Sequence, residues 1–190
     1  HFPIDVKAIN VNYLSGSAHK FHGPKGVGFV YMRGDSNLDA FINGGGQERS
    51  YRSGTENLIS IVAIGKAFEL ANINMESRKD HIIEIKNYLE KRLIEEIEGI
   101  SFNGDPENSL FTVLSCSFPP RYTSDMFLFN LDLSGIACSG GSACSSGAQK
   151  ASHVLKAINH QEDRQTIRFS FSHFNTKKEA DYLIEVLKKM

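Results

Sequence analysis

The chain is short of several features that define particular classes of protein. Its 190 residues include no tryptophan and only 3 cysteines. A small, odd number of cysteines makes no disulfide framework, so we expect a reducing cytoplasm. The formal net charge of −1 offers no electrostatic footprint for nucleic acid. No apolar run approaches the roughly 18 residues of a membrane span, so neither nucleic acid nor a membrane is an expected partner.

The potential metal ligands are poorly spaced for a structural metal site. Cys138 and Cys144 do not form a CxxC pair, and His19 and His22 have no further ligands near them in the sequence. Structural zinc sites use four such ligands at short, regular spacings. We therefore expect no structural zinc site.

Two regions of different character follow one another along the chain. Residues 1–56 hold short apolar runs broken by glycines, which indicates strands and loops. Residues 58–71 are nearly all apolar, which predicts a buried helix. Beyond residue 75 helical and strand patterns alternate, as is typical of a compact α/β or α+β lobe. We therefore expect two regions, over residues 1–72 and residues 73–190, of which the second forms a small domain; the resemblance given below implies that the first is part of a large domain.

The small domain has a clear order of expected elements. Apolar residues at spacings of three and four predict an amphipathic helix over Ser77–Glu98, which Gly99 ends. A capping box from Thr176 to Glu179 begins the last helix. Between these helices we expect a strand at Phe111–Phe118, a helix at Ser124–Leu131, a strand edge at Ile136–Ser145, a helix at Ala151–Ile158 and a strand at Thr166–Phe171.

A lysine among small polar residues is the first candidate for chemistry. The run Ser17-Ala18-His19-Lys20 leads through the glycines of residues 23–28 into an apolar run. Lysine forms Schiff bases, and small polar neighbours can hydrogen-bond phosphate oxygens beside it. The pattern therefore suits a covalently held, phosphate-bearing cofactor. An ordinary glycine-rich loop before a strand explains the same residues, and the motif alone leaves both interpretations open.

A cysteine in a run of small residues is the second candidate. Cys144 stands within Ser139–Gly147, where serine, glycine and alanine surround it. Such a loop has nothing to anchor it to a core, so we expect it to be solvated and mobile. An exposed thiol there is a candidate nucleophile, and an incidental surface cysteine is the alternative. Cys116, in an apolar strand, and Cys138, beside an apolar pair, are expected to be structural.

Four sequence blocks follow one another along the chain. They are Ser17-Ala18-His19-Lys20 with Gly23-Pro24-Lys25-Gly26, Gly44-Gly45-Gly46-Gln47-Glu48-Arg49 with Arg52-Ser53-Gly54-Thr55, Gly141-Ser142-Ala143-Cys144, and Ile167-Arg168-Phe169-Ser170. Together they resemble the cysteine desulfurases, pyridoxal-phosphate enzymes of the aspartate-aminotransferase-like superfamily. The long Ser/Gly-rich cysteine loop is most similar to the branch that feeds iron–sulfur cluster assembly.

The resemblance implies which residues hold the cofactor. Lys20 would carry pyridoxal 5'-phosphate as a Schiff base, within a cofactor-binding set of Ser17, Ala18, His19 and Lys20. Ser17 and His19 would contact the phosphate. Thr55 would reach the phosphate in the neighbouring subunit of a homodimer, although it could instead simply start the helix that follows.

The resemblance also implies which residues act on the substrate. Arg168 would bind the carboxylate of L-cysteine, since a planar guanidinium suits bidentate binding; it could instead be a surface charge on an edge strand. Cys144 as a thiolate would take the substrate sulfur, leaving L-alanine and a persulfide for a sulfur-acceptor protein. Cys144 is also a possible transient iron–sulfur ligand shared with a scaffold protein.

For the fold, the resemblance implies an α/β chain: a remnant of a fold type I large domain plus a small C-terminal α+β domain. It covers only the second half of such enzymes. The histidine that stacks on the cofactor ring and the acid that pairs with its nitrogen would lie in the other half, so we expect this chain alone to be inactive. Two other interpretations stay open. One is a non-catalytic docking module for sulfur-acceptor proteins, and the other is a related pyridoxal-phosphate-dependent lyase or aminotransferase.

Overall fold

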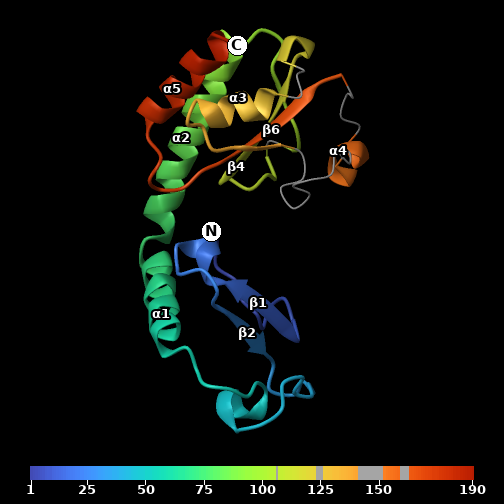
Figure 1. Ribbon diagram of the computed structural model, residues 1–190, viewed down its shortest axis with the longest axis vertical. Helices are drawn as coiled ribbons and strands as arrows, with labels where there is room; N and C mark the ends of the chain where they lie inside the picture. The colour runs from blue at the N-terminus through green and yellow to red at the C-terminus, as the bar shows by residue number, and fades with distance from the viewer. Residues whose placement is uncertain (106, 123–125, 141–151, 159–162) are drawn as a thin grey trace. The chain divides into compact units, whose positions relative to one another are not determined.

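The chain folds into two compact units. The computed structural model describes every residue except 106, 123–125, 141–151 and 159–162 (Figure 1). Internal contacts divide the chain into His1–Met75, here unit 1, and Glu76–Met190, here unit 2. The boundary expected from the sequence lies between residues 72 and 73.

A β-hairpin organises unit 1. Strand β1 (Tyr13–Ser17) pairs antiparallel with strand β2 (Gly28–Met32), and the register sets Ser17 opposite Gly28. Glycine is required at position 28, because a Cβ there would lie 2.5 Å from the carbonyl oxygen of Gly16. The close approach of the two backbones therefore depends on the absence of a side chain.

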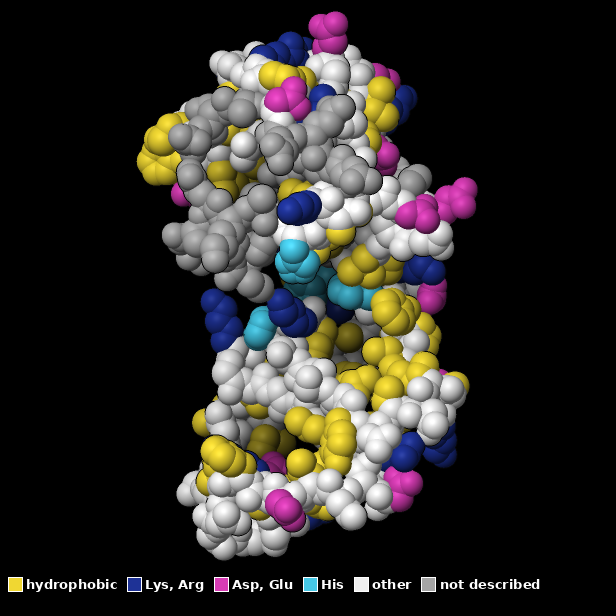
Figure 2. Space-filling view, turned by 90° about the vertical axis from the view of Figure 1, so that its right-hand side faces the viewer, with side chains coloured by type: hydrophobic (Ala, Val, Ile, Leu, Met, Phe, Trp, Pro, Cys, Tyr) yellow, Lys and Arg dark blue, Asp and Glu magenta, His cyan; other side chains and the backbone are white. Residues whose placement is uncertain are grey.

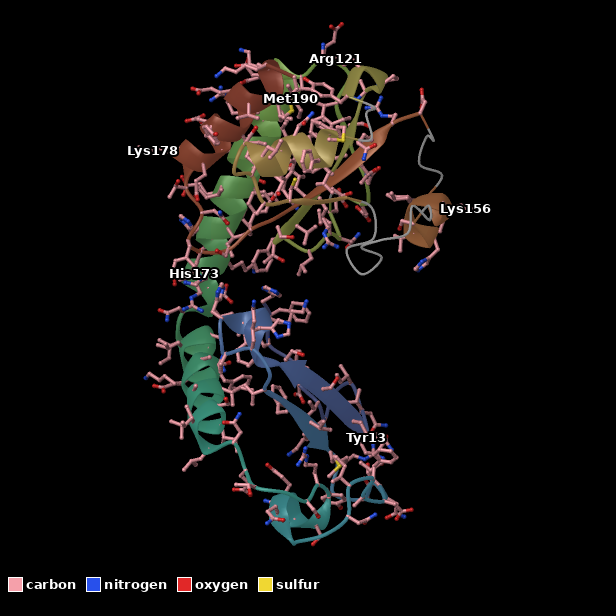
Figure 3. The ribbon with its side chains drawn as sticks, viewed as in Figure 1. Tyr13, Arg121, Lys156, His173, Lys178 and Met190 are labelled. Carbon is pink, nitrogen blue, oxygen red and sulfur yellow. The ribbon has the colours of Figure 1, made fainter. Side chains whose placement is uncertain are left out.

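Short helical segments follow the strands of unit 1. The 3-10 helix η1 (Ala18–Phe21) comes directly after β1, and η2 (Gln47–Ser50) lies in the loop that leads to helix α1 (Leu58–Ile73). At the end of β1 farther from η1, the Tyr13 hydroxyl donates a hydrogen bond of 2.9 Å to the carbonyl oxygen of Asn37 (Figure 3). This bond fastens the chain beyond β2 to the hairpin.

Helix α1 is confirmed in position, but the prediction that it is buried is wrong for the described structure. The Phe68 ring packs edge-to-face on Phe21 and Phe29 of the hairpin, with centroid distances of 6.0 and 6.1 Å. No residue of α1 is buried, and Ile59 is 86% exposed. The hairpin covers one side of a helix whose apolar residues are not confined to one face. Hydrophobic side chains consequently gather on the surface of unit 1 (Figure 2).

The lengths and compositions of the helices bear on membrane insertion. No single helix of the described residues is long and apolar enough to cross a membrane. The consecutive helices α1 and α2 (Met75–Glu96) are long and apolar enough to cross a membrane only if both are counted as one segment.

A four-stranded antiparallel sheet organises unit 2, in the order β3-β4-β6-β5. The strands are β3 (Ser101–Phe102), β4 (Val113–Phe118), β5 (Ser139–Gly140) and β6 (Gln165–Ser170). The helices after α2 are η3 (Pro120–Tyr122), α3 (Phe127–Leu133), α4 (His153–Ala157) and α5 (Lys177–Lys188). Successive side chains of a strand point to opposite faces, so the sheet separates an apolar face from a polar one.

The hydrophobic core of unit 2 lies against the apolar face. Cys116 of β4 is opposite Ile167 of β6, and both are fully buried. Leu93 of α2, Leu131 of α3 and Leu187 of α5 complete the same cluster, and all three are 0% exposed. Each such side chain contributes roughly 1.5–3 kcal/mol by leaving water, so three helices hold one face of the sheet.

The periodic elements of unit 2 confirm the sequence predictions. Helix α2 occupies the predicted amphipathic stretch, and Gly99 just beyond it takes the left-handed conformation with φ of +78°. The capping box of α5 is present: Glu179 N–H donates to the Thr176 hydroxyl, and Thr176 N–H donates to the Glu179 carboxylate at 2.6 Å. Of the strand edge predicted at Ile136–Ser145, the described residues show β5 alone, and residues 141–145 lie outside them.

Polar side chains join α2 to α5 on the solvent side of the core. The Tyr88 hydroxyl donates to Asp181 at 2.7 Å, and Arg92 forms an ion pair with the same carboxylate. Lys188 Nζ lies 2.6 Å from Glu96 and donates a hydrogen bond that lowers the pKa of that carboxyl. Solvent-exposed pairs of this kind add little stability, so their main effect is to align the two helices.

Two neighbouring residues of α2 test the position of the core. Leu93→Ala should lower the free energy of unfolding by about 2–5 kcal/mol, because it leaves a cavity among well-packed groups. Urea unfolding followed by circular dichroism measures this. Ile94 is 60% exposed, so Ile94→Ala should change the same free energy by less than about 0.5 kcal/mol. Equal losses in the two variants would contradict the packing described here.

Candidate active site

A tight turn at the end of β1 presents the candidate lysine. Ala18 is fully buried, and its N–H donates to the carbonyl oxygen of Val27 at 3.1 Å. Its own carbonyl accepts from Gly23 N–H at 2.8 Å, while His22 between them takes φ of +67°. Ala18 therefore anchors the turn, and its neighbours Ser17 and Lys20 are left on the surface.

The exposed residues of this turn carry donors that the described part of the chain leaves without partners. Ser17, His19 and Lys20 are exposed, and the Ser17 hydroxyl does not cap η1. None of the three side chains forms a hydrogen bond or an ion pair with another described residue. A hydroxyl, an imidazole and an amine on one turn are suited to bind a phosphate and to react with a carbonyl group. The first sequence motif is thus brought together as one cluster.

The loop that carries Thr55 is closed by its own hydrogen bonds. Ser53 is buried, and its hydroxyl donates to the carbonyl oxygen of Gly45 at 2.7 Å. Glu48, Arg49 and Ser50 take left-handed φ values of 48°, 57° and 67° in succession, a conformation costly for residues other than glycine. The loop ends in an exposed Thr55.

Thr55 does not begin α1, so that alternative is wrong. The N-cap of α1 is Asn57, whose side chain accepts a hydrogen bond of 3.3 Å from Ser60 N–H. The Thr55 hydroxyl has no partner among the described residues. It is therefore free to contact a ligand, as the resemblance requires.

Arg168 lies at the centre of the polar sheet face in unit 2. Strand β6 runs between β4 and β5, so Arg168 is opposite Ser115 on one side and Ser139 on the other. The alternative that Arg168 is a charge on an edge strand is therefore wrong. Its side chain is half-buried, and its Nε atom is buried with no hydrogen-bond partner in the part of the chain that the structure describes. An unpaired buried donor is costly until an acceptor reaches it.

The three cysteines differ in burial and in the pKa of the thiol, where the structure describes them. Cys116 is fully buried, and burial raises the pKa of its thiol, which confirms a packing role. Cys138 is half-buried, and burial, with a smaller contribution from Asp132, raises its pKa to about 11. Cys144 lies outside the described residues. The described residues hold no group of three or more potential metal ligands.

The polar sheet face contains residues that sequence reasoning missed. Arg164 Nε donates to the Ser117 hydroxyl at 2.8 Å, and its Nη2 donates to the Ser117 carbonyl oxygen at 2.6 Å. Asn103 Nδ2 donates to the Ser115 hydroxyl at 3.1 Å. The alternation of serine with apolar residues in β4 was the available signal, since a period of two puts Ser115 and Ser117 on one face.

Comparison with known proteins shows the family. The aminotransferase class-V family matches residues 1–183. The chain belongs to this family. A curated cysteine desulfurase IscS of Dictyoglomus turgidum is 38% identical over 192 residues, which are 100% of this chain and 48% of that protein. A cysteine desulfurase of Sinorhizobium fredii is 42% identical over 187 residues, which are 97% of this chain and 48% of that protein.

Solved structures agree with this assignment. A NifS-like protein superimposes with a TM-score of 0.85 at 33% sequence identity, over 98% of this chain and 48% of its own. A NifS-like protein of Rickettsia africae gives a TM-score of 0.83 at 29% identity, over 98% of this chain and 49% of its own. The expected α/β fold and the resemblance to cysteine desulfurases are confirmed. The chain spans about half the length of the curated relatives it matches.

Alkylation of the native chain tests the difference between the thiols. At pH 8 a Cys138 thiol with a pKa of about 11 should react with iodoacetamide roughly 100-fold more slowly than an unperturbed thiol, because little thiolate is present. Cys144, in its run of small residues, should react first, as measured by peptide mass mapping over time. Raising the pH toward 11 should speed the reaction of Cys138. Cys144→Ser is the control that removes the fast phase, and equal rates at Cys138 and Cys144 would contradict the prediction.

Proposed function

We propose that residues 1–190 carry the reacting groups of a pyridoxal-phosphate-dependent cysteine desulfurase that acts on L-cysteine. The main support is the turn η1, where an amine, an imidazole and a hydroxyl lie together without partners among the described residues. Further support comes from the curated relatives named cysteine desulfurase, which align with nearly the whole chain. The proposal assigns a task to each of the exposed groups.

The donor set of unit 1 suits pyridoxal 5'-phosphate. Lys20 Nζ is the proposed attachment point, since a lysine amine condenses with a carbonyl carbon. Ser17 and His19 are the proposed phosphate contacts, and buried Ala18 holds both in place. Thr55 is the proposed phosphate contact from the second subunit of a homodimer. When bound, the cofactor withdraws electrons from the α-carbon of the substrate.

Arg168 is the proposed anchor of the substrate carboxylate. Its buried Nε–H has no acceptor in the described structure, and a carboxylate supplies one with opposite charge. Because β6 is paired on both sides, the base of the side chain is held firmly. Substrate bound there is oriented by its carboxylate.

Cys144 is the proposed sulfur acceptor. Its thiolate forms an S–S bond with the substrate sulfur as the substrate C–S bond breaks, and that electron pair remains with carbon, which takes up a proton. Overall, L-cysteine and one thiol give L-alanine and one persulfide, so carbon is reduced while the two sulfurs are oxidised. The persulfide sulfur then passes to an acceptor protein of iron–sulfur cluster assembly, which we place in the cytoplasm.

We propose that a second segment completes the enzyme. It corresponds to the part of the relatives, about half of their length, that this chain does not cover. We call residues 1–190 together with that segment the two-half enzyme. The groups that stack on the cofactor ring and pair with its nitrogen are assigned to the second segment, so the 190-residue chain alone should not turn over L-cysteine.

Borohydride reduction tests the attachment at Lys20. The two-half enzyme incubated with pyridoxal phosphate and reduced should gain one pyridoxyl group, found on Lys20 by peptide mass spectrometry. Lys20→Ala should lose the label, whereas Lys25→Ala, at another exposed lysine after the same turn, should keep it.

The 190-residue chain alone should release no sulfide from L-cysteine, and steady sulfide release by it would refute the need for a second segment.

The variant Cys144→Ser separates catalysis from docking. In the two-half enzyme it should reduce sulfide release from L-cysteine about 100-fold or more, because a serine hydroxyl is a far weaker nucleophile than a thiolate. Cys138→Ser is the matched control and should retain activity. Unchanged sulfide release by Cys144→Ser would instead favour a docking module or a related lyase or aminotransferase.

A further inference from the structure

The polar face of the unit 2 sheet places a second free donor beside Arg168. Ser115 and Arg168 are directly opposite each other on β4 and β6. Side chains in such a pair lie on the same face, with Cβ atoms about 4.5–5.5 Å apart. Ser115 is half-buried, as Arg168 is. A ligand that reaches one of these side chains therefore reaches the other.

Both of these side chains have a donor that is unused within the described structure. Arg168 Nε is buried without a hydrogen-bond partner. The Ser115 hydroxyl accepts a hydrogen bond but donates none to another described residue. A hydroxyl has one proton to donate and two lone pairs. Two neighbouring donors without acceptors among the described residues suit an acceptor that a ligand supplies.

Asn103 determines which role the Ser115 hydroxyl takes. The backbone N–H of Asn103 donates to the Ser115 carbonyl oxygen at 2.9 Å, and its Nδ2 donates to the Ser115 hydroxyl at 3.1 Å. The same Nδ2 lies 3.5 Å from the Thr166 hydroxyl, on the face of β6 that carries Arg168. Since the amide nitrogen only donates, it occupies an acceptor position of Ser115 and leaves the hydroxyl proton for another partner.

The other arginine of this face shows the contrast. Arg164 Nε donates to the Ser117 hydroxyl at 2.8 Å, and its Nη2 reaches the carbonyl oxygens of Ser117 and Gly99. Its donors hold the turn that follows α2 against the sheet. Arg168, four positions farther along the chain and within β6, has a buried donor with no acceptor among the described residues.

We infer that Ser115 is a second donor to the substrate carboxylate at Arg168, and that Asn103 is the positioning residue that keeps its hydroxyl proton available. The inference rests on the proposed function, because it takes Arg168 as the carboxylate anchor. It adds a neutral donor on the neighbouring strand. Ser115 and Arg168 then approach one carboxylate from two strands, which fixes the orientation of the bound amino acid as well as its affinity.

A titration of the 190-residue chain with sodium acetate tests the inference without cofactor or turnover. The Nε–H signal of Arg168, assigned by its loss in Arg168→Lys, is followed by nuclear magnetic resonance. Sodium chloride at equal ionic strength is the reference. Acetate should shift this signal saturably, and Ser115→Ala should weaken the apparent binding about 10-fold, as expected for loss of a hydrogen bond to a charged group.

Matched variants separate positioning from a general loss of structure. Ser115→Thr keeps the hydroxyl and should restore binding. Asn103→Asp should weaken binding, because its carboxylate accepts the Ser115 proton and attracts Arg168. Ser170→Ala removes an exposed hydroxyl from the same face of β6 and should leave binding unchanged. Thermal unfolding of each variant shows whether the fold is intact.

The outcomes distinguish the inference from the proposed function. If acetate shifts the Arg168 signal equally in the wild type and in Ser115→Ala, Ser115 is not a carboxylate donor and the inference is overturned, while the role of Arg168 stands. If acetate does not shift the Arg168 signal at all, the proposed anchor fails and the inference fails with it. Weakened binding in Ser115→Ala with recovery in Ser115→Thr supports it.

Discussion

Pairing of β6 on both of its edges is the constraint on which unit 2 depends. The strand places Ile167 in the core and Arg168 on the polar face. A slip of one residue would exchange the two faces, which would expose Ile167 and bury a charge without a partner, a change that costs several kcal/mol. The apolar residue and the charged residue therefore specify the same register. The core packing and the position of the proposed carboxylate anchor are set by one feature.

The elements of unit 2 were predictable because their periodicity reflects a buried face. In α2 the spacing of three and four corresponds to a stripe that includes Ile85, Leu89 and Leu93, all buried. In α1 no such stripe exists. A helix with apolar residues on several sides is suited to burial, but its sequence does not show which other residues pack against it. The helix was therefore predicted correctly and its surroundings were not.

The chemistry of the residues alone predicted the candidate site only where it is local in sequence; Thr55 and Arg168 were found through the family resemblance. Ser17, His19 and Lys20 lie on one turn, so a short motif was sufficient to find them. The contacts of Asn103 depend on strands that meet only in the folded chain, across 63 positions in the case of Thr166. A single sequence gives each of these residues no more than a polar position. Their place in the strand order, and not their residue type, brings them to the sheet face that carries Arg168.

The burial of Ala18 has a consequence for how the lysine turn can vary. A Cβ at Gly23 would lie 2.9 Å from the Ala18 Cβ and 3.0 Å from the Ala18 carbonyl oxygen, so position 23 has no room for a side chain while Ala18 and its turn are retained. This restriction comes from the packing of the turn itself and does not depend on a bound ligand. A glycine kept at position 23 in a related protein would therefore reflect the geometry of the turn, whether or not that protein retains the chemistry of the lysine.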